Sequence, residues 1–262
     1  MIDEQNFLGK YGPYALVTGA TSGIGKAFAQ ELARQGFNLV LVARRNNLLD
    51  EMATQFATQH GTVVTTIEQD LSAVDGARNV LKATQALDIG LVVSNAGFSL
   101  KGAHESNDPQ EMTRMLLLNC HTPTQLTHGF IPRVKERGRG GIVLTGSVEG
   151  LIGCPYSGVY SASKAFIKSL GEALWAELKP HGVDVLTLCP GATDTEGLRK
   201  AGFDPSRIPH IDQPDNVVKK ALAEIANGPT YVSNDHYREL FEQLTSMPRD
   251  QALLAMTKGM AA

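Results

Sequence analysis

Short apolar runs rich in β-branched residues alternate along this chain with longer stretches in which apolar residues recur every three or four positions. The short runs predict strands at Tyr14–Thr18, Asn38–Val42, Val63–Glu68, Ile89–Val93, Gly141–Thr145 and Val183–Cys189, with another near Tyr231. The longer stretches predict helices at Ile24–Gln35, Asn47–His60, Val74–Gln85, Pro109–Arg137, Gly158–His181, Gln213–Asn227 and His236–Thr245. This alternation indicates an α/β fold, a parallel sheet with helices on both faces, because a right-handed crossover needs a helix to return the chain.

The periodicity weakens after Pro190, where prolines and glycines at 191, 197, 202, 205, 209 and 214 predict a long loop. A long loop in a compact domain is usually functional or disordered. No linker, repeat or block of like charges interrupts the rest of the series. We therefore expect residues 1–262 to form one domain with a loop excursion at about 192–212.

Composition excludes several classes of protein. The 262 residues hold 24 Lys and Arg against 27 Asp and Glu, so the concentrated basic surface that nucleic-acid binding requires is not expected. Three widely spaced cysteines without a CxxC pair, and seven histidines without an HExxH motif, predict neither a disulfide framework nor a metal site. The apolar runs are strand-sized and the N-terminus has no secretory signal, so we expect no membrane span and a cytoplasmic protein.

The segment Leu16–Gly25, LVTGATSGIG, lies where the first strand should end and the first helix begin. Glycines allow a tight turn and a close approach of the backbone to a diphosphate, and free N–H groups at a helix start bind anions. The spacing Gly19-x3-Gly23-x-Gly25 differs from GxGxxG, and a plain strand–helix turn would also need flexible residues. Its place after the first strand of an α/β series favours nucleotide binding.

A second group of residues suggests proton transfer. Tyr160 and Lys164 are one helical turn apart and share a face, while Ser147 follows a predicted strand. A tyrosine loses its proton near pH 10, but a neighbouring ammonium stabilises the phenolate and makes the residue a usable acid or base. A serine at the strand end can hold a substrate oxygen. Taken singly, a Tyr and a Lys at this spacing are usually a surface pair.

Four motifs follow one another along the chain: Thr18–Gly25 (TGATSGIG), Ser94–Gly97 (SNAG), Ser147 with Tyr160-x3-Lys164, and Pro190-Gly191. In this order they resemble the classical short-chain dehydrogenase/reductase family, over nearly the whole length from Gly12 to about Tyr231. The segments 10–18 and 43–45 are similar to the branch that includes hydroxysteroid and 3-oxoacyl reductases. Ser94 departs from the family's NNAG motif, and the run ATDT after Gly191 leaves open which threonine contacts the nicotinamide.

The resemblance implies a Rossmann-type doubly wound parallel sheet of about seven strands, with a hydride-transfer site at the carboxyl ends of its strands. Tyr160 would exchange a proton with the substrate oxygen, and Ser147 would polarise the carbonyl. Lys164 would bind the nicotinamide ribose and lower the pKa of Tyr160. Asn119, late in the predicted helix Pro109–Arg137, would anchor a water that links Lys164 to solvent.

The resemblance also implies cofactor contacts from the glycine-rich turn and from the ends of later strands. Besides Tyr160 and Lys164, these residues are Gly19, Thr21, Ser22, Gly23, Ile24, Gly25, Asp70, Leu71, Asn95, Ala96, Gly97, Pro190, Gly191 and Thr193. An alternative for Asp70 is an ordinary loop acid that caps the next helix.

The end of the second strand bears on the choice of cofactor. In NAD enzymes of this fold an acidic residue there binds the ribose hydroxyls, but here the strand runs into Ala43-Arg44-Arg45. Arg44 offers a planar guanidinium to a 2′-phosphate, with Arg45 beside it. We therefore expect NADP(H). The alternative is that both arginines are solvated loop charges.

Three segments are expected to line the substrate pocket, namely 98–102, 148–156 and 192–211. Their bulky members are mainly apolar, which favours a hydrophobic carbonyl compound. The expected substrate contacts are Phe98, Ser147, Glu149, Cys154 and Tyr160, although Glu149 could equally be a solvated loop acid and Cys154 a core residue.

These observations predict an NADP(H)-dependent enzyme that interconverts a ketone and a secondary alcohol. The long helices Pro109–Arg137 and Gly158–Lys179 carry apolar residues on more than one face, and the resemblance implies a homodimer or homotetramer. One alternative is a nucleotide-binding regulator on the same fold without turnover, which the four filled catalytic positions disfavour. An epimerase or dehydratase of the extended type would need a longer chain.

Overall fold

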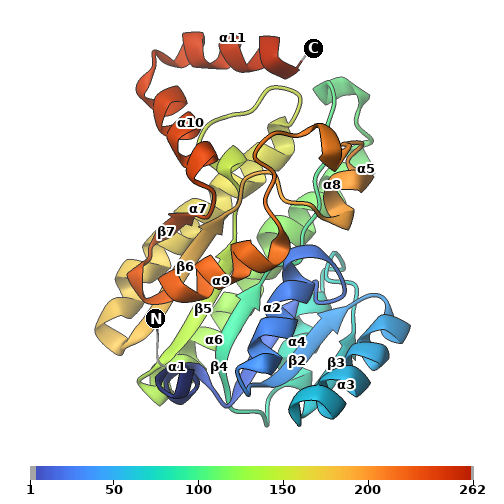
Figure 1. The fold of residues 1–262 in the computed structure, drawn as a ribbon, viewed down its shortest axis with the longest axis vertical. Helices are drawn as coiled ribbons and strands as arrows, with labels where there is room; N and C mark the ends of the chain where they lie inside the picture. Colours follow the sequence, from blue (N-terminus) through green and yellow to red (C-terminus); the bar gives the residue numbers. More distant parts are fainter. Residues whose placement is uncertain (1–3, 261–262) are drawn as a thin grey trace.

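A computed structural model describes residues 4–260 and contains a seven-stranded sheet in which every neighbouring pair of strands is parallel (Figure 1). The strand order is β3-β2-β1-β4-β5-β6-β7, so the chain starts in the middle, moves to one edge, crosses back and moves to the other. The predicted doubly wound α/β fold is confirmed. The strands are β1 Tyr14–Thr18, β2 Asn38–Ala43, β3 Val64–Glu68, β4 Ile89–Ser94, β5 Gly140–Thr145, β6 Val183–Cys189 and β7 Thr230–Val232.

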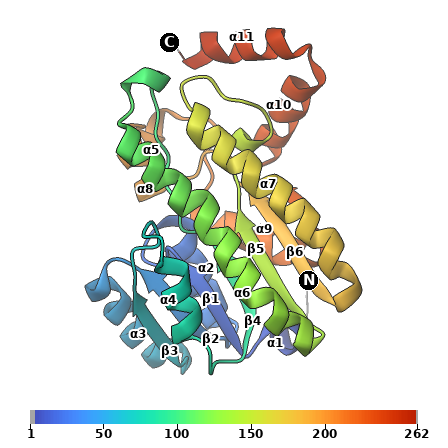
Figure 2. The ribbon, with the colours of Figure 1, turned by 180° about the vertical axis from the view of Figure 1, so that it is seen from behind.

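Helices cover both faces of the sheet. One face carries α2 (Gly23–Arg34), α3 (Asn46–His60) and α9 (Pro214–Glu224), which stand in front of the sheet in Figure 1. The opposite face carries α4 (Gly76–Ala83), α6 (Thr122–Arg137) and α7 (Gly158–Leu178), which come to the front in Figure 2. The sheet is therefore the middle of three layers.

Hydrophobic clusters lie on both sides of the sheet and divide the strand residues between them. Leu16 faces the core that contains Phe130 of α6, whereas its neighbour Val17 faces the core that contains Phe28 of α2. Successive side chains of a strand point to opposite faces, so a strand buried on both sides must be apolar throughout. All six residues of β4 are buried, which explains why the central strands were visible as continuous apolar runs.

The helix predicted over Pro109–Arg137 is interrupted. The structure has α5 (Pro109–Leu116), a π-helical turn (Leu117–His121) and α6. Proline lacks a backbone N–H, so Pro123 cannot donate to the carbonyl of Asn119 four residues earlier. The missing α-helical bond accounts for a wider turn here, and π-helical turns are frequent at functional sites.

The helix predicted at His236–Thr245 is confirmed as α10 (Asp235–Ser246), whereas α1 (Glu4–Tyr11) and α11 (Arg249–Met260) at the two ends of the chain were not predicted. α1 lies near the amino ends of the strands, where the Tyr11 hydroxyl donates to Asp184 Oδ2 at 2.6 Å. At the other end of the molecule, α10 and α11 extend beyond the carboxyl ends of the strands (Figure 1). The expected loop at about 192–212 contains a short α-helix, α8 (Glu196–Lys200), and a 3-10 turn at Pro205–Arg207.

Candidate active site

The motif residues meet at one edge of the sheet because parallel strands end on the same side. The glycine-rich turn follows β1, and Asn95–Gly97 follows β4. Ser147 comes two residues after β5, and Pro190-Gly191 follows β6. Segments about 170 residues apart in sequence thus form one site at the carboxyl end of the sheet.

The glycine-rich turn requires its glycines. Gly19 and Gly23 have φ values of +67° and +52°, in the left-handed region that favours glycine. A Cβ atom on Gly25 would lie 2.3 Å from the carbonyl oxygen of Gly19. Ser22, the N-cap of α2, makes no side-chain capping bond. The backbone N–H groups at the start of this helix are therefore available to an anion.

Thr18 fastens the turn to the neighbouring strand. Its hydroxyl accepts hydrogen bonds from the backbone N–H groups of Asn95 at 2.9 Å and Ala96 at 3.0 Å. The Asn95 side chain donates to the Thr18 carbonyl at 3.2 Å and accepts from the Thr145 hydroxyl at 3.3 Å. These bonds link the ends of β1, β4 and β5.

Asn119 lies in the π-helical turn, where its side chain is almost completely buried. Its amide exchanges two bonds with the backbone of Phe98, donating at 3.0 Å and accepting at 3.2 Å, and donates to Ser163 Oγ at 3.1 Å. A Cβ atom on Gly97 would lie 3.0 Å from Asn119 Oδ1 and 3.6 Å from Lys164 Nζ. Asn119 and Lys164 therefore both lie close to Gly97, where a larger residue would meet them.

Ser147, Tyr160 and Lys164 complete the expected group of four. Tyr160 and Lys164 lie one turn apart on α7, and Lys164 Nζ is 5.6 Å from the centre of the Tyr160 ring. Lys164 is buried and donates to the Thr145 carbonyl at 2.7 Å. Ser147 hydrogen-bonds Tyr160 and accepts from the Glu149 N–H at 3.2 Å.

Burial controls the ionisation of this group. It raises the pKa of Tyr160, and the Glu149 carboxylate adds to the rise, while the bond from Ser147 opposes it. Burial also lowers the pKa of Lys164 to about 8. The expected lowering of the Tyr160 pKa by Lys164 is not what this state of the protein shows, because desolvation outweighs the nearby ammonium. A phenol kept protonated is the form that a general acid needs.

Lys101 was missed by the sequence analysis. Its ammonium contacts both carboxylate oxygens of Glu149, at 2.6 and 2.7 Å, and lies 5.1 Å from the centre of the Tyr160 ring. Glu149 is thus neither a free substrate contact nor a solvated acid, but half of an ion pair. A lone lysine after a strand carries no sequence signal that would distinguish it from a surface residue.

At the expected adenosine end of the site, the two arginines behave differently. Arg44 is exposed, whereas Arg45 donates to the Thr21 hydroxyl and carbonyl, each at 3.2 Å, and forms an ion pair with Glu196 of α8 at 3.0 Å. Asp70 accepts from the N–H and hydroxyl of Ser72, so it closes its own turn. It does not cap the next helix as the alternative expected, because the N-cap of α4 is Asp75. Next to Asp70, Leu71 is buried.

The segment after β6 is held by α10. A Cβ atom on Gly191 would lie 2.1 Å from the Tyr237 ring, and the Tyr237 hydroxyl bonds the backbone of Ala192. Thr193 donates to the Gly191 carbonyl at 3.1 Å and pairs with Asp212 across the base of the loop. Glycine at 191 is required by this close approach.

One wall of the expected substrate region is apolar. Val148, Ile152 and Cys154 pack in a cluster with Phe241 of α10 and Ala252 of α11. Burial raises the pKa of the Cys154 thiol to about 12, so this cysteine is a packing residue rather than a nucleophile. The contribution of α10 and α11 was missed because no motif marks it.

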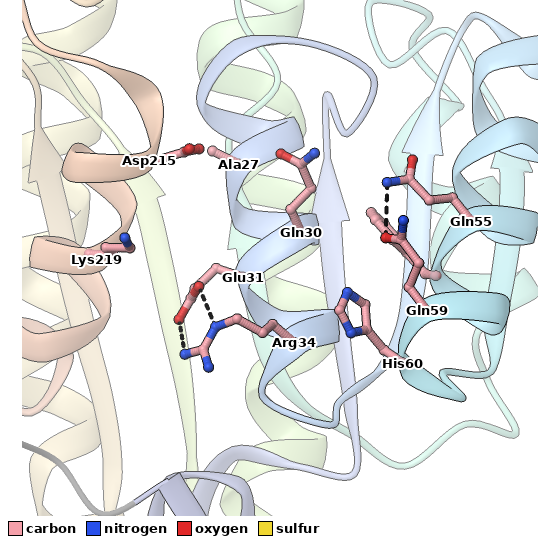
Figure 3. A pocket seen from close by; sticks show the side chains of 10 residues that line it. Ala27, Gln30, Glu31, Arg34, Gln55, Gln59, His60, Asp215 and Lys219 are labelled. Carbon is pink, nitrogen blue, oxygen red and sulfur yellow. Dashed lines mark hydrogen bonds and ion pairs between the residues drawn. The ribbon is translucent and has the colours of Figure 1, made fainter.

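A hollow of about 290 Å³ lies away from this group, between α2, α3 and α9 (Figure 3). Its lining is largely polar and consists of Ala27, Gln30, Glu31, Arg34, Gln55, Phe56, Gln59, His60, Asp215 and Lys219. Within residues 4–260 there is no group of three His, Cys, Asp or Glu side chains that could hold a metal ion. The described helices include none that is long and apolar enough to cross a membrane.

Comparison with known proteins gives consistent matches. The family model described as short chain dehydrogenase matches residues 13–204. A 7beta-hydroxysteroid dehydrogenase from Clostridium sardiniense is 32% identical over 254 residues, 97% of each chain. A very-long-chain 3-oxoacyl-CoA reductase from Neurospora crassa is 37% identical over 222 residues, 83% of this chain and 66% of the reductase. A short-chain dehydrogenase from Sphingobium yanoikuyae, solved in complex with NADPH, has a TM-score of 0.83 and 31% identity, over 93% of this chain and 95% of that chain.

Proposed function

Because the chain belongs to the short-chain dehydrogenase family and is an oxidoreductase, we propose that it interconverts a hydrophobic ketone and its secondary alcohol with NADP(H). The observation that carries the proposal is the meeting of Asn119, Ser147, Tyr160 and Lys164 at the carboxyl end of the sheet, where Asn119 and Lys164 both lie close to Gly97. Gly97 follows the strand that Thr18 ties to the glycine-rich turn. One site can therefore hold a dinucleotide and a carbonyl group together.

The residues of this site divide the work of carbonyl reduction. A bound nicotinamide would supply or accept the hydride. Tyr160 donates its proton to the carbonyl oxygen, since burial keeps the phenol protonated, and Ser147 hydrogen-bonds the same oxygen. Lys164, with a pKa near 8, can exchange a proton close to neutrality. Asn119 hydrogen-bonds the backbone of Phe98 and thereby holds the segment after β4 in place beside the site.

The glycine-rich turn has the close backbone approaches and the uncapped helix start that suit the pyrophosphate of either dinucleotide. Two further features support NADP(H) over NAD(H). No carboxylate follows β2, and Arg44 presents an exposed guanidinium there. A relative of similar fold was solved with NADPH.

Two features support a hydrophobic substrate. The wall formed by residues 148–154 and α10 is apolar, and pockets lined in this way favour apolar ligands with few polar anchors. The matched relative from Clostridium sardiniense is named for a hydroxysteroid, which is a largely apolar alcohol.

The test is NADPH consumption with a panel of steroidal, aromatic and aliphatic ketones beside polar sugars. We expect turnover with members of the first three groups. Tyr160→Phe should slow it by about 10²- to 10⁴-fold, the usual contribution of a general acid, while NADPH still binds. Activity confined to sugars would overturn the substrate class. NADPH binding without turnover of any carbonyl would favour the regulatory alternative.

We also propose that the chain forms a homo-oligomer through the face that α5 and α7 share. These two helices are in contact, and each exposes a large apolar side chain, Leu116 on α5 and Phe166 on α7. Apolar side chains on neighbouring helices favour contact with a second copy of the chain. The expected cytoplasmic location stays a prediction.

A further inference from the structure

We propose that Lys101 is a positioning residue of this site, whose ammonium pairs with Glu149 and shields the Tyr160 hydroxyl from the charge of that carboxylate. The inference rests on the proposed function, because it assigns Lys101 a part in the proton chemistry of Tyr160. It concerns a residue that belongs to none of the four family motifs.

The contacts of Lys101 form a closed group. Its ammonium donates to Oε1 and Oε2 of Glu149 at 2.6 and 2.7 Å and to Ser157 Oγ at 2.8 Å. Ser157 in turn donates to Glu149 Oε2 at 2.5 Å. All three donors of the ammonium are therefore used.

Three separate segments build this group. Lys101 lies on the loop after β4, Glu149 lies in the short turn after β5, and Ser157 directly precedes α7. The Gly102 N–H donates to the Tyr156 carbonyl at 2.8 Å, which fixes the Lys101 loop beside the start of α7. The ammonium is therefore held in place by both side-chain and backbone bonds.

The pair lies in a partly buried place, where charges act more strongly than at the surface. The Lys101 and Glu149 side chains are 19% and 22% exposed, and Ser157 is buried. Lys101 Nζ lies 5.1 Å from the centre of the Tyr160 ring. Because the Glu149 carboxylate is bonded to this ammonium, leaving it unpaired here changes the ionisation of the neighbouring phenol.

The other groups that face Tyr160 come from several elements. Lys164 lies on the same helix, and Ser147 hydrogen-bonds the phenol. Cys154 and Cys189 are also near, but burial raises the pKa of each thiol to about 12, so both are uncharged at neutral pH. The same Glu149 carboxylate contributes, after burial, to the raised pKa of Tyr237 of α10.

These charges set the direction of each substitution. Glu149 raises the pKa of Tyr160, so Lys101→Met, which leaves the carboxylate unpaired, should raise that pKa further. Glu149→Gln removes the negative charge and leaves the ammonium, so it should lower the pKa. The double variant removes both charges and should return close to the parent protein.

Fluorine NMR of protein made with fluorotyrosine measures this directly, without any need for turnover. Tyr160→Phe assigns the Tyr160 signal among the six tyrosines. We expect the titration midpoint to rise by about one pH unit in Lys101→Met and to fall by a similar amount in Glu149→Gln. Lys101→Arg, which keeps the charge, should restore most of the parent value. Relative to the parent, the pH profile of alcohol oxidation by each variant should shift in the same direction as its NMR titration midpoint.

Lys10→Met is the matched control. Lys10 pairs at 2.5 Å with the buried Asp184 at the opposite end of the sheet, so its loss also leaves a carboxylate without its cation, but far from Tyr160. An unchanged midpoint in both Lys101→Met and Glu149→Gln, or an equal shift in Lys10→Met, would overturn the inference. If Lys101→Met fails to fold, Glu149→Gln and Lys101→Arg decide the question alone. Absence of turnover in the parent would count against the proposed function and leave the NMR result standing.

Discussion

Lys164 shows how burial and function oppose each other within one side chain. The folded protein encloses its amine and gives it one backbone acceptor, the Thr145 carbonyl. Enclosure disfavours the charged form, so the pKa falls to about 8. Burial of this charged amine therefore lowers the stability of the protein at neutral pH, but it also brings the pKa close enough to neutrality for the amine to exchange its proton easily.

This opposition predicts a pH-dependent effect of Lys164→Met on stability. Between about pH 8 and the ordinary lysine value of 10.5, the unfolded chain binds more protons at this residue than the folded chain. The parent therefore gains stability as pH rises through that range, by up to about 1.4 kcal/mol for each unit of pKa difference. The variant lacks this gain. The unfolding free energy of Lys164→Met minus that of the parent should therefore fall between pH 8 and pH 10.5. Below pH 8 this difference should be constant.

Urea unfolding at a series of pH values measures this difference. The same substitution at Lys82, an exposed residue of α4, is the control and should give a difference that does not vary with pH. A pH-independent difference for Lys164→Met as well would show that its amine is not desolvated in the folded protein.

Arg44 carries the prediction on cofactor choice. An exposed guanidinium that binds a 2′-phosphate should contribute about 1.5–3 kcal/mol, a ten- to hundredfold preference for NADPH over NADH. Arg44→Asp should reverse the order, because the new carboxylate repels the phosphate and accepts a ribose hydroxyl. Fluorescence titration of both reduced cofactors measures it, with Arg78→Asp on α4 as the control. Equal affinities of the unmodified protein would contradict the prediction.

The site residues that could be predicted from the sequence are those whose residue type is required by the chemistry or by the backbone geometry. Gly19 and Gly25 are constrained by a positive φ and by a close contact, and Tyr160 and Lys164 by their shared helix face. Lys101 was not visible, because its importance comes from a pairing across 48 residues with Glu149. A pairing of that kind exists only once the loops are placed.

Among the helices, α7 shows how closely an element can approach the sheet. Gly171 faces Thr187 of β6, and a Cβ atom on this glycine would lie 1.9 Å from Thr187 Oγ1. Alanine is the better helix former by about 1 kcal/mol, so propensity and packing oppose each other at this position. The buried, β-branched threonine has little freedom to move away.

We predict that packing decides the outcome. Gly171→Ala should lower the unfolding free energy by about 1–3 kcal/mol, the usual cost of overpacking a core. Gly9→Ala in α1 is the matched control, because a Cβ atom there has no neighbour within 4 Å, and it should be neutral or stabilising. Thermal and urea unfolding measure both. A stabilised Gly171→Ala would mean that α7 can shift away from β6.

The π-helical turn and α11 were not predicted from the sequence, each for its own physical reason. The π-helical turn keeps helical spacing of its apolar residues, so periodicity alone does not separate it from α5 and α6. α11 has weak amphipathic character and exposes Leu254 while Ala252 is buried. By contrast, the strands were found because burial on both faces leaves long apolar runs.

At the scale of the whole molecule, the prediction concerns association. Phe166 is 44% exposed on α7, and a charged residue there should be costly in an interface between copies. Phe166→Glu should convert the proposed homo-oligomer to a monomer at micromolar concentrations, as measured by light scattering after gel filtration. Val74→Glu, at an exposed apolar residue before α4, is the control and should leave the mass unchanged. A parent protein that is monomeric would contradict the prediction.

The bridge from Arg45 to Glu196 joins the turn after β1 to the loop at about 192–212, which is expected to line the substrate pocket. Arg45 holds Thr21 of that turn and Glu196 of α8 at the same time, so its two partners are connected through one guanidinium. Energetic coupling of this kind is reciprocal. A dinucleotide that drew Arg45 towards its phosphate would loosen the loop, and a substrate that held the loop in place would change the affinity for the dinucleotide by the same factor. The affinities of the two ligands would thereby be linked through a single ion pair at the surface.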